Sequence, residues 1–367
     1  MLVNKTSPII PIRIFIILLF SLLLSCSLDQ SLVKFIPNHD WDEAKPEDVG
    51  LRSESLENAF TTAMNTQFVD GLLVVRNGKL VGERYYNGYD KFSPHNVKSV
   101  SKSFLSALTG IALQEGIIND LNQKVIPFFS DYVLSNIDPR LNDLIIRDLL
   151  MMRMGIVHER QNYMQIYNSP SWIQTTLDLE LIDDPGTVFH YNTYQTHLLS
   201  AILTRQSGMN TFELCEEYLA DPIQVTIHDW HTGPEGYYFG GNSMFFTPRD
   251  MAVLGYLYLN DGMINGNQIV PESWVTESTT DYTQFKNRSW GSLHNYNYSY
   301  LWWLGEIGGY EVFLAIGYGG QFIINFPELD MIVVSTAKEE LSWNDADVQE
   351  RAILKIVADH IIPAVIN

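Results

Sequence analysis

Residues 97–112 read Val-Lys-Ser-Val-Ser-Lys-Ser-Phe-Leu-Ser-Ala-Leu-Thr-Gly-Ile-Ala, and this stretch guides the interpretation of the whole chain. Its apolar residues recur at intervals of three and four, which predicts a helix. Ser99 and Lys102 form the pattern S-x-x-K at its start. A serine oxygen in a first helical turn lies near backbone N–H groups that favour a developing oxyanion. Lys102 faces the same side, and a partly desolvated lysine can accept the serine proton. The stretch therefore predicts a nucleophilic serine with a lysine base.

A pattern as short as S-x-x-K also arises by chance. It occurs a second time at residues 31–34, in a polar tether, where we assign it no role. Ser99 by itself would equally suit a helix N-cap. The catalytic interpretation of Ser99 therefore depends on the rest of the sequence.

Strand-like segments lie at both ends of the chain, with helical segments between them. Residues 71–86 contain two β-rich runs around Asn77-Gly78, a dipeptide that favours a two-residue hairpin turn. Four β-rich runs follow residue 300, and an amphipathic helix is expected over residues 345–362. These segments predict an α+β fold with one antiparallel sheet from N- and C-terminal strands, covered by the terminal helices. A mainly helical lobe over about residues 100–240 is inserted between the strands, and the cleft between lobes is the expected ligand site. Further helices are expected over residues 55–64, 143–152, 172–179, 195–205, 212–219 and 247–259.

The first thirty residues predict a targeting signal. Lys5 and Arg13 precede an apolar stretch over residues 14–24, which is too short to span a bilayer but suits a signal peptide. It ends Leu-Leu-Ser-Cys26, which resembles the bacterial lipobox, whose cysteine is lipidated and becomes the mature N-terminus. We therefore expect a lipoprotein of the cell envelope, held on a membrane by Cys26 and facing the periplasm. An ordinary secretory signal or an uncleaved anchor is the alternative. The expected divisions of the chain are a signal peptide over residues 1–25, a tether over 26–50 and one domain over 51–367.

Composition and charge exclude several classes of protein. The chain has 43 Asp and Glu against 23 Lys and Arg, a net charge of −20, so we expect no nucleic-acid partner. The hydrophobic content of 46% supports a core and excludes wholesale disorder. Two cysteines cannot build a disulfide framework or a cysteine metal cluster, and Cys215 is expected to be a buried apolar residue. The chain has no nucleotide-binding glycine motif and no histidine metal spacing, so no cofactor or metal is expected.

Several segments, taken in order, resemble the serine β-lactamase superfamily. Residues 97–112 look like its nucleophile helix, and the closest branch is the class C-like group of esterases, D-amino-acid peptidases and 6-aminohexanoate-dimer hydrolases. Each segment is a weak signal alone, but the ordered set covers about residues 45–365. The other matching segments are residues 71–86, 145–150, 185–193, 240–252, 265–274 and 317–321.

The resemblance implies roles for individual residues. Ser99 would be the acyl-accepting nucleophile, and Lys102 its proton partner. Tyr191 would be a second base that passes the proton to the leaving group. The backbone N–H groups of Ser99 and Gln321 would form the oxyanion hole. Thr193 and the segment Tyr318-Gly319-Gly320 would line the substrate site.

The sequence departs from the family pattern at positions that bear on the substrate. Tyr318 stands where relatives have the lysine of K-T-G, which binds the carboxylate of a β-lactam or of a D-Ala terminus. Thr193 lacks the amide of the usual Asn. Met151, Met152 and Met154 are expected to make the cleft edge apolar. These changes favour a neutral ester or amide over an anionic peptide terminus.

The sequence therefore predicts a lipid-anchored serine hydrolase that cleaves a small-molecule ester or amide through an acyl-enzyme. The first alternative is a β-lactamase or DD-peptidase. The second is a non-catalytic envelope binding protein that has kept the fold. The sequence does not indicate the oligomeric state.

Overall fold

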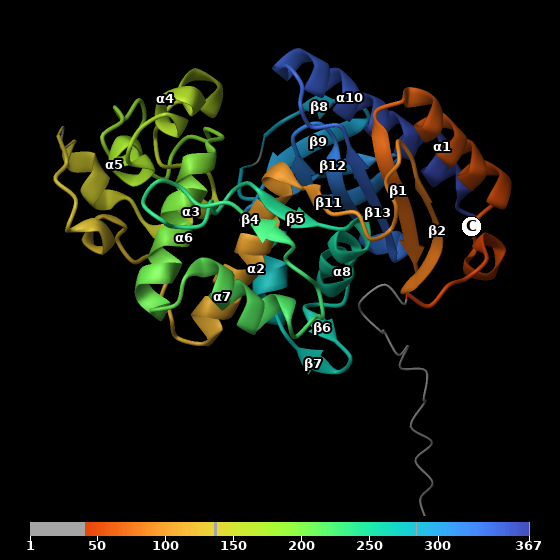
Figure 1. The fold of residues 1–367 in the computed structure, drawn as a ribbon, viewed down its shortest axis with the longest axis horizontal. Coiled ribbons are helices and arrows are strands. Elements are labelled where there is room, and N and C mark those ends of the chain that lie inside the picture. Colours follow the sequence, from red (N-terminus) through yellow and green to blue (C-terminus); the bar gives the residue numbers. More distant parts are fainter. Residues whose placement is uncertain (1–40, 136–137, 284, 367) are drawn as a thin grey trace, which may run out of the picture. The chain divides into compact units, whose positions relative to one another are not determined.

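A computed structural model describes residues 41–135, 138–283 and 285–366. The expected signal peptide, Cys26 and most of the tether lie outside the described residues. The main sheet has eight strands in the order β2-β1-β13-β12-β11-β10-β9-β8 (Figure 1). All its neighbouring strands are antiparallel, and β1 lies beside β13, so the sheet joins the two ends of the chain. This confirms the expected α+β architecture. The strands are β1 (Val69–Arg76), β2 (Lys79–Tyr85), β8 (Ser289–Trp290), β9 (Leu293–Tyr298), β10 (Trp303–Ile307), β11 (Tyr310–Gly317), β12 (Gln321–Phe326) and β13 (Met331–Ala337).

The hairpin of β1 and β2 forms where Asn77-Gly78 predicted it. Both turn residues have positive φ, 52° for Asn77 and 68° for Gly78, as a tight hairpin turn requires. Along β1, Leu72 and Val74 enter one apolar cluster and Leu73 and Val75 another. Both faces of this strand are therefore buried here, which explains why residues 72–75 are continuously apolar instead of alternating.

Helices cover both faces of the sheet. On one face, α1 (Ser53–Thr66) and α10 (Trp343–Ile356) contribute apolar side chains to the cluster that contains Val74. On the other face, α2 (Ser101–Gln114) and α8 (Pro248–Leu259) pack into the cluster that contains Val75 (Figure 1). Because α2 lies between the sheet and the other helices, twelve of its residues are buried. The segment that begins with Ser99 is thus anchored in the core.

The inserted region is mainly helical, as expected, but its elements differ in detail. The helix expected over residues 143–152 is shorter, because Ile145 is extended and α3 begins only at the next residue. Cys215 ends α7 and is 1% exposed, in agreement with its expected burial. The helices of this region are α3 (Ile146–Leu150), α4 (Tyr163–Tyr167), α5 (Trp172–Leu177), α6 (Thr193–Ser207) and α7 (Thr211–Cys215).

Several short elements had no clear sequence signal. Strands β8 and β9 form the edge of the main sheet and are rich in polar residues, so they lack a continuous apolar run. In the part of the chain that the structure describes, no helix is long and apolar enough to cross a membrane. The remaining elements are β3 (His95–Asn96), β4 (Asp229–Trp230), β5 (Met244–Phe246), β6 (Met263–Ile264), β7 (Asn267–Gln268) and α9 (Glu272–Ser278).

Candidate active site

Ser99 lies in a 3₁₀ turn, η2 (Lys98–Val100), that leads directly into α2. This turn packs against the ends of β11 and β12. The approach is close, because a Cβ atom on Gly317 would lie 2.3 Å from the Val97 carbonyl oxygen. A glycine at the end of β11 therefore lets the sheet and the serine turn meet. The sequence placed Ser99 in the first turn of the helix, and the structure places it just before α2.

The Lys102 amine is held by three oxygens. Its Nζ lies 2.8 Å from Ser99 Oγ, 3.0 Å from Thr193 Oγ1 and 2.7 Å from the Gly241 carbonyl oxygen. The side chain is 1% exposed. Burial lowers the pKa of Lys102 to about 7, while the negative charge of Glu159 acts in the opposite direction. A substantial fraction of this amine is therefore neutral near neutral pH and can accept a proton.

The Tyr191 ring lies beside the Lys102 amine. Lys102 Nζ is 4.9 Å from the centre of the Tyr191 ring, and Ser99 is within hydrogen-bonding reach of the phenol. Trp303 stacks on the same ring at 5.8 Å between centroids. Burial, followed by the charge of Glu159, holds the pKa of Tyr191 well above its usual value. Tyr191 is therefore a neutral phenol that can donate a proton, and Lys102 is the stronger candidate for the first base.

Glu159 is a site residue that the sequence analysis missed. It lies in η5 (Glu159–Gln161) and is 6% exposed. Its Oε2 accepts hydrogen bonds from the Thr193 N–H at 2.8 Å and from the Thr193 hydroxyl at 2.5 Å. Its own N–H donates to the Tyr191 carbonyl oxygen at 2.9 Å. Nothing in the local sequence marks this carboxylate, because its neighbours His158 and Arg160 suggest only a polar loop.

The turn between β11 and β12 lies beside the serine and is fixed by α10. The Gly319 N–H donates to Glu350 Oε1 at 2.8 Å, and burial raises the pKa of Glu350 to about 7. The Tyr318 hydroxyl donates to the Leu341 carbonyl oxygen at 2.8 Å. Tyr318 was expected to line the substrate site. The single proton of its hydroxyl is instead donated to Leu341.

The two remaining residues of this turn face the protein interior. A Cβ atom on Gly320 would lie 2.3 Å from Ile353 Cδ1, so this position faces α10. The Gln321 side chain donates to the Ala337 carbonyl oxygen at 2.7 Å and accepts from the Ala337 N–H at 3.1 Å. Gln321 is fully buried and does not line the cavity at Ser99.

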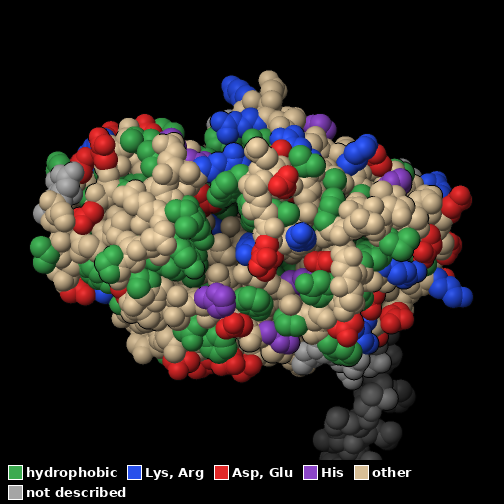
Figure 2. Space-filling model, turned by 45° about the horizontal axis from the view of Figure 1, so that its top comes forward, with side chains coloured by type: hydrophobic (Ala, Val, Ile, Leu, Met, Phe, Trp, Pro, Cys, Tyr) green, Lys and Arg blue, Asp and Glu red, His purple; other side chains and the backbone are tan. Residues whose placement is uncertain are grey.

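A cavity of about 390 Å³ opens at Ser99 and is also lined by Thr193 and Tyr318. Figure 2 shows a hollow on the face of the molecule between the two lobes, with Lys, Arg, Asp and Glu side chains around it. Lys98 at the cavity is paired with Glu339 at 2.8 Å. The guanidinium of Arg160 lies 5.0 Å from the ring centre of Trp343.

The three methionines that were expected at the cleft edge do not line this cavity. Met151, Met152 and Met154 are 6%, 0% and 0% exposed and belong to the core. That expectation was wrong, because these apolar side chains are buried in the core instead of facing the cavity. They consequently say nothing about the substrate.

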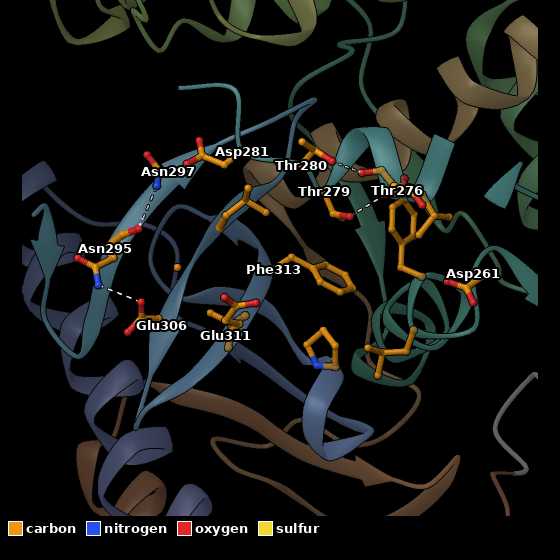
Figure 3. Close-up of a pocket in the computed structure, with 17 residues that line it drawn as sticks. Asp261, Thr276, Thr279, Thr280, Asp281, Asn295, Asn297, Glu306, Glu311 and Phe313 are labelled. Carbon is orange, nitrogen blue, oxygen red and sulfur yellow. Dashed lines mark hydrogen bonds between the residues drawn. The ribbon is translucent and has the colours of Figure 1, made fainter. Parts of the chain in front are cut away.

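A second cavity, of about 640 Å³, shares no lining residue with the one at Ser99. It lies between α9 and strands β9 to β11, and polar side chains such as Asn295, Glu306 and Glu311 surround it (Figure 3). Asn295 Nδ2 donates to Glu306 Oε1 at 2.9 Å, so these two side chains are paired with each other. Neither Ser99 nor Lys102 lines this cavity, and we assign it no catalytic role.

No group of three His, Cys, Asp or Glu side chains suited to a metal ion occurs among the described residues. His228 and His231, the closest pair in the sequence, lie on either side of β4. His231 Nε2 contacts Asp229 at 3.3 Å, and His228 Nε2 lies 3.7 Å from Asp250. Their nearest acidic partners are thus separate carboxylates.

Comparisons with known proteins identify the family of this chain. The Beta-lactamase family model matches residues 56–358. The chain is 24% identical over 303 residues to the 6-aminohexanoate-dimer hydrolase of Paenarthrobacter ureafaciens, covering 76% of this chain and 74% of that protein.

The solved structures that share the fold include the following two. The octameric penicillin-binding protein homologue from Pyrococcus abyssi has a TM-score of 0.66 at 17% identity, covering 84% of this chain and 77% of that one. EstCE1, a hydrolase with promiscuous acyltransferase activity, has a TM-score of 0.66 at 14% identity, covering 83% and 99%. The resemblance inferred from the ordered motifs is confirmed, and the chain belongs to the Beta-lactamase family.

Proposed function

We propose that this protein is a serine hydrolase that cleaves small esters or amides through an acyl-enzyme on Ser99. One observation carries the proposal: the buried Lys102 amine lies 2.8 Å from Ser99 Oγ. Its lowered pKa of about 7 makes it a base at neutral pH. Membership of a family whose relatives include hydrolases supports this chemistry.

In the proposed reaction, neutral Lys102 takes the Ser99 proton as Oγ bonds to the substrate carbonyl carbon. The bond from that carbon to the leaving group then breaks. The leaving group takes a proton from the Tyr191 hydroxyl, and the Lys102 ammonium returns a proton to Tyr191. Water next attacks the acyl carbon and gives its proton to Lys102, which is neutral again. Ser99 Oγ leaves with that proton, which restores the enzyme.

The oxyanion that forms on the carbonyl needs two N–H donors. The N–H groups of Ser99 and Tyr318 donate to no acceptor within the described ranges, and both residues line the cavity. We therefore favour the Tyr318 amide as the second donor over that of Gln321, the residue suggested by the family pattern. The Glu350 contact to Gly319 would hold the Tyr318 amide in place.

A substrate panel tests this proposal. p-Nitrophenyl acetate and butyrate, a p-nitroanilide and nitrocefin are each incubated with the purified protein, and release of chromophore is followed. We expect turnover of the esters to exceed that of nitrocefin, because Tyr318 replaces the lysine that would bind a β-lactam carboxylate. Faster turnover of nitrocefin would instead support a β-lactamase. Absence of turnover with every compound would support a non-catalytic binding protein.

A further inference from the structure

A buried carboxylate lies one side chain away from the Lys102 amine. Glu159 contacts Thr193, and Thr193 contacts Lys102. A buried carboxylate usually has a charged partner beside it, because isolated burial of a charge is costly. Here the link to the cation runs through a neutral hydroxyl. Glu159 therefore forms no direct ion pair with Lys102, and the Thr193 hydroxyl links the two groups.

The direction of each hydrogen bond follows from counting protons. An ionised carboxylate only accepts, so the single hydroxyl proton of Thr193 is donated to Glu159. The Thr193 oxygen must then accept from Lys102, 3.0 Å away. The Gly241 carbonyl oxygen also only accepts, and it lies 2.7 Å from the same Nζ.

A neutral lysine amine has two protons and one lone pair. With its protons committed to Thr193 and Gly241, the lone pair is left facing Ser99 Oγ, the third neighbour of Nζ. This is the orientation in which the amine can receive the serine proton. If the Thr193 proton pointed at Lys102 instead, the lone pair would be occupied and Ser99 would lose its base.

We propose that Glu159 is a positioning residue that orients the Thr193 hydroxyl and so aims the lone pair of neutral Lys102 at Ser99. The inference rests on the proposed function, since it concerns how that site is prepared. Glu159 has a second effect, because its negative charge favours the ammonium form of Lys102. It therefore also affects the pH at which the base becomes available.

The charged groups around Lys102 affect its pKa and therefore the pH dependence of kcat/KM. Glu159 from η5 and the Tyr191 phenol are the titratable groups that face the amine. Glu350 from α10 acts on Tyr191, and Lys98 at the cavity is neutralised by Glu339. Glu159 is the carboxylate with a direct electrostatic effect on Lys102, so its removal is expected to change the pKa of this base.

Two substitutions separate charge from hydrogen-bond direction. Glu159→Gln keeps a carbonyl oxygen that can accept both Thr193 protons but removes the charge. The acid limb of kcat/KM for a p-nitrophenyl ester should move to lower pH by roughly one unit, with the plateau within about tenfold of the wild type. Glu159→Met removes the acceptor as well. In this variant the acid limb should shift by a similar amount, and the plateau value of kcat/KM should lie about 100-fold below that of Glu159→Gln.

Glu235→Gln and Glu235→Met are the matched controls. Glu235 Oε1 likewise accepts from a hydroxyl and an amide, those of Ser171 at 2.6 Å and Ile173 at 2.8 Å, and it has no contact with Lys102. These variants should keep the wild-type acid limb. Thermal melting of all four variants identifies any that fail to fold, and Glu159→Gln remains decisive because it keeps the hydrogen bonds.

The outcomes are distinct. An acid limb that stays at the wild-type pH in Glu159→Gln would overturn the inference, as would a Glu159→Met plateau equal to that of Glu159→Gln. Equal shifts in the Glu235 variants would also overturn it, because the effect would then be general. Absence of turnover in the wild type would count against the proposed function itself.

Discussion

Ser99→Ala is expected to lower kcat for a p-nitrophenyl ester by at least about 10⁴-fold, because loss of a nucleophile removes the covalent route altogether. Its hydroxyl contacts Lys102 and Tyr191, the two groups that would move its proton. The substitution removes a single oxygen atom from the edge of a cavity, so the fold should remain intact. Initial rates of p-nitrophenol release, compared at equal protein concentration, measure the effect.

Ser103→Ala is the matched control for this prediction. Ser103 lies four residues further on, is 1% exposed and donates to the Leu301 carbonyl oxygen at 2.9 Å. Its loss should reduce stability by about 1 kcal/mol and leave kcat within a few-fold of the wild type. Residual Ser99→Ala activity within tenfold of the wild type would mean that another group attacks the substrate.

Lys102→Met is expected to lower kcat/KM by about 10³-fold, within the range usual for a general base. Methionine keeps most of the buried volume but cannot accept a proton. Because the pKa of Lys102 is lowered to about 7, the wild type should lose activity as the pH falls through this value and the amine becomes charged. The remaining activity of Lys102→Met should lack that acid limb.

Lys98→Met serves as the control for the pH profile. Lys98 lines the same cavity but is paired with Glu339 and lies in the turn with Ser99. Its replacement should keep an acid limb near pH 7. If the limb persisted in Lys102→Met and vanished in Lys98→Met, the base would be assigned to the wrong lysine.

The sequence patterns located the elements that depend on local signals. A tight hairpin turn with positive φ at two consecutive residues favours Asn followed by Gly, and the hairpin forms at Asn77-Gly78. The helix expected over residues 247–259 is α8, and Thr247 caps it directly before Pro248. The S-x-x-K pattern brought Ser99 and Lys102 together because three residues make about one helical turn.

Features that depend on distant contacts were not predictable in the same way. Glu159 meets Thr193 only after the helical region folds, and no local pattern distinguishes it from a solvated loop carboxylate. The methionines were expected at the cleft edge but are buried in the core, because an apolar residue type does not by itself fix which way its side chain points. The choice between the Tyr318 and Gln321 amides needed the geometry of the turn after β11.

The most direct test of the central claim is the location of a covalent label. The purified protein is treated with a fluorophosphonate, digested and analysed by mass spectrometry, beside Ser99→Ala and Ser103→Ala. Our account predicts one adduct per chain on Ser99, present in Ser103→Ala and absent in Ser99→Ala. A label on any other residue, or an unlabelled wild type that still hydrolyses esters, would contradict the claim that Ser99 is the nucleophile.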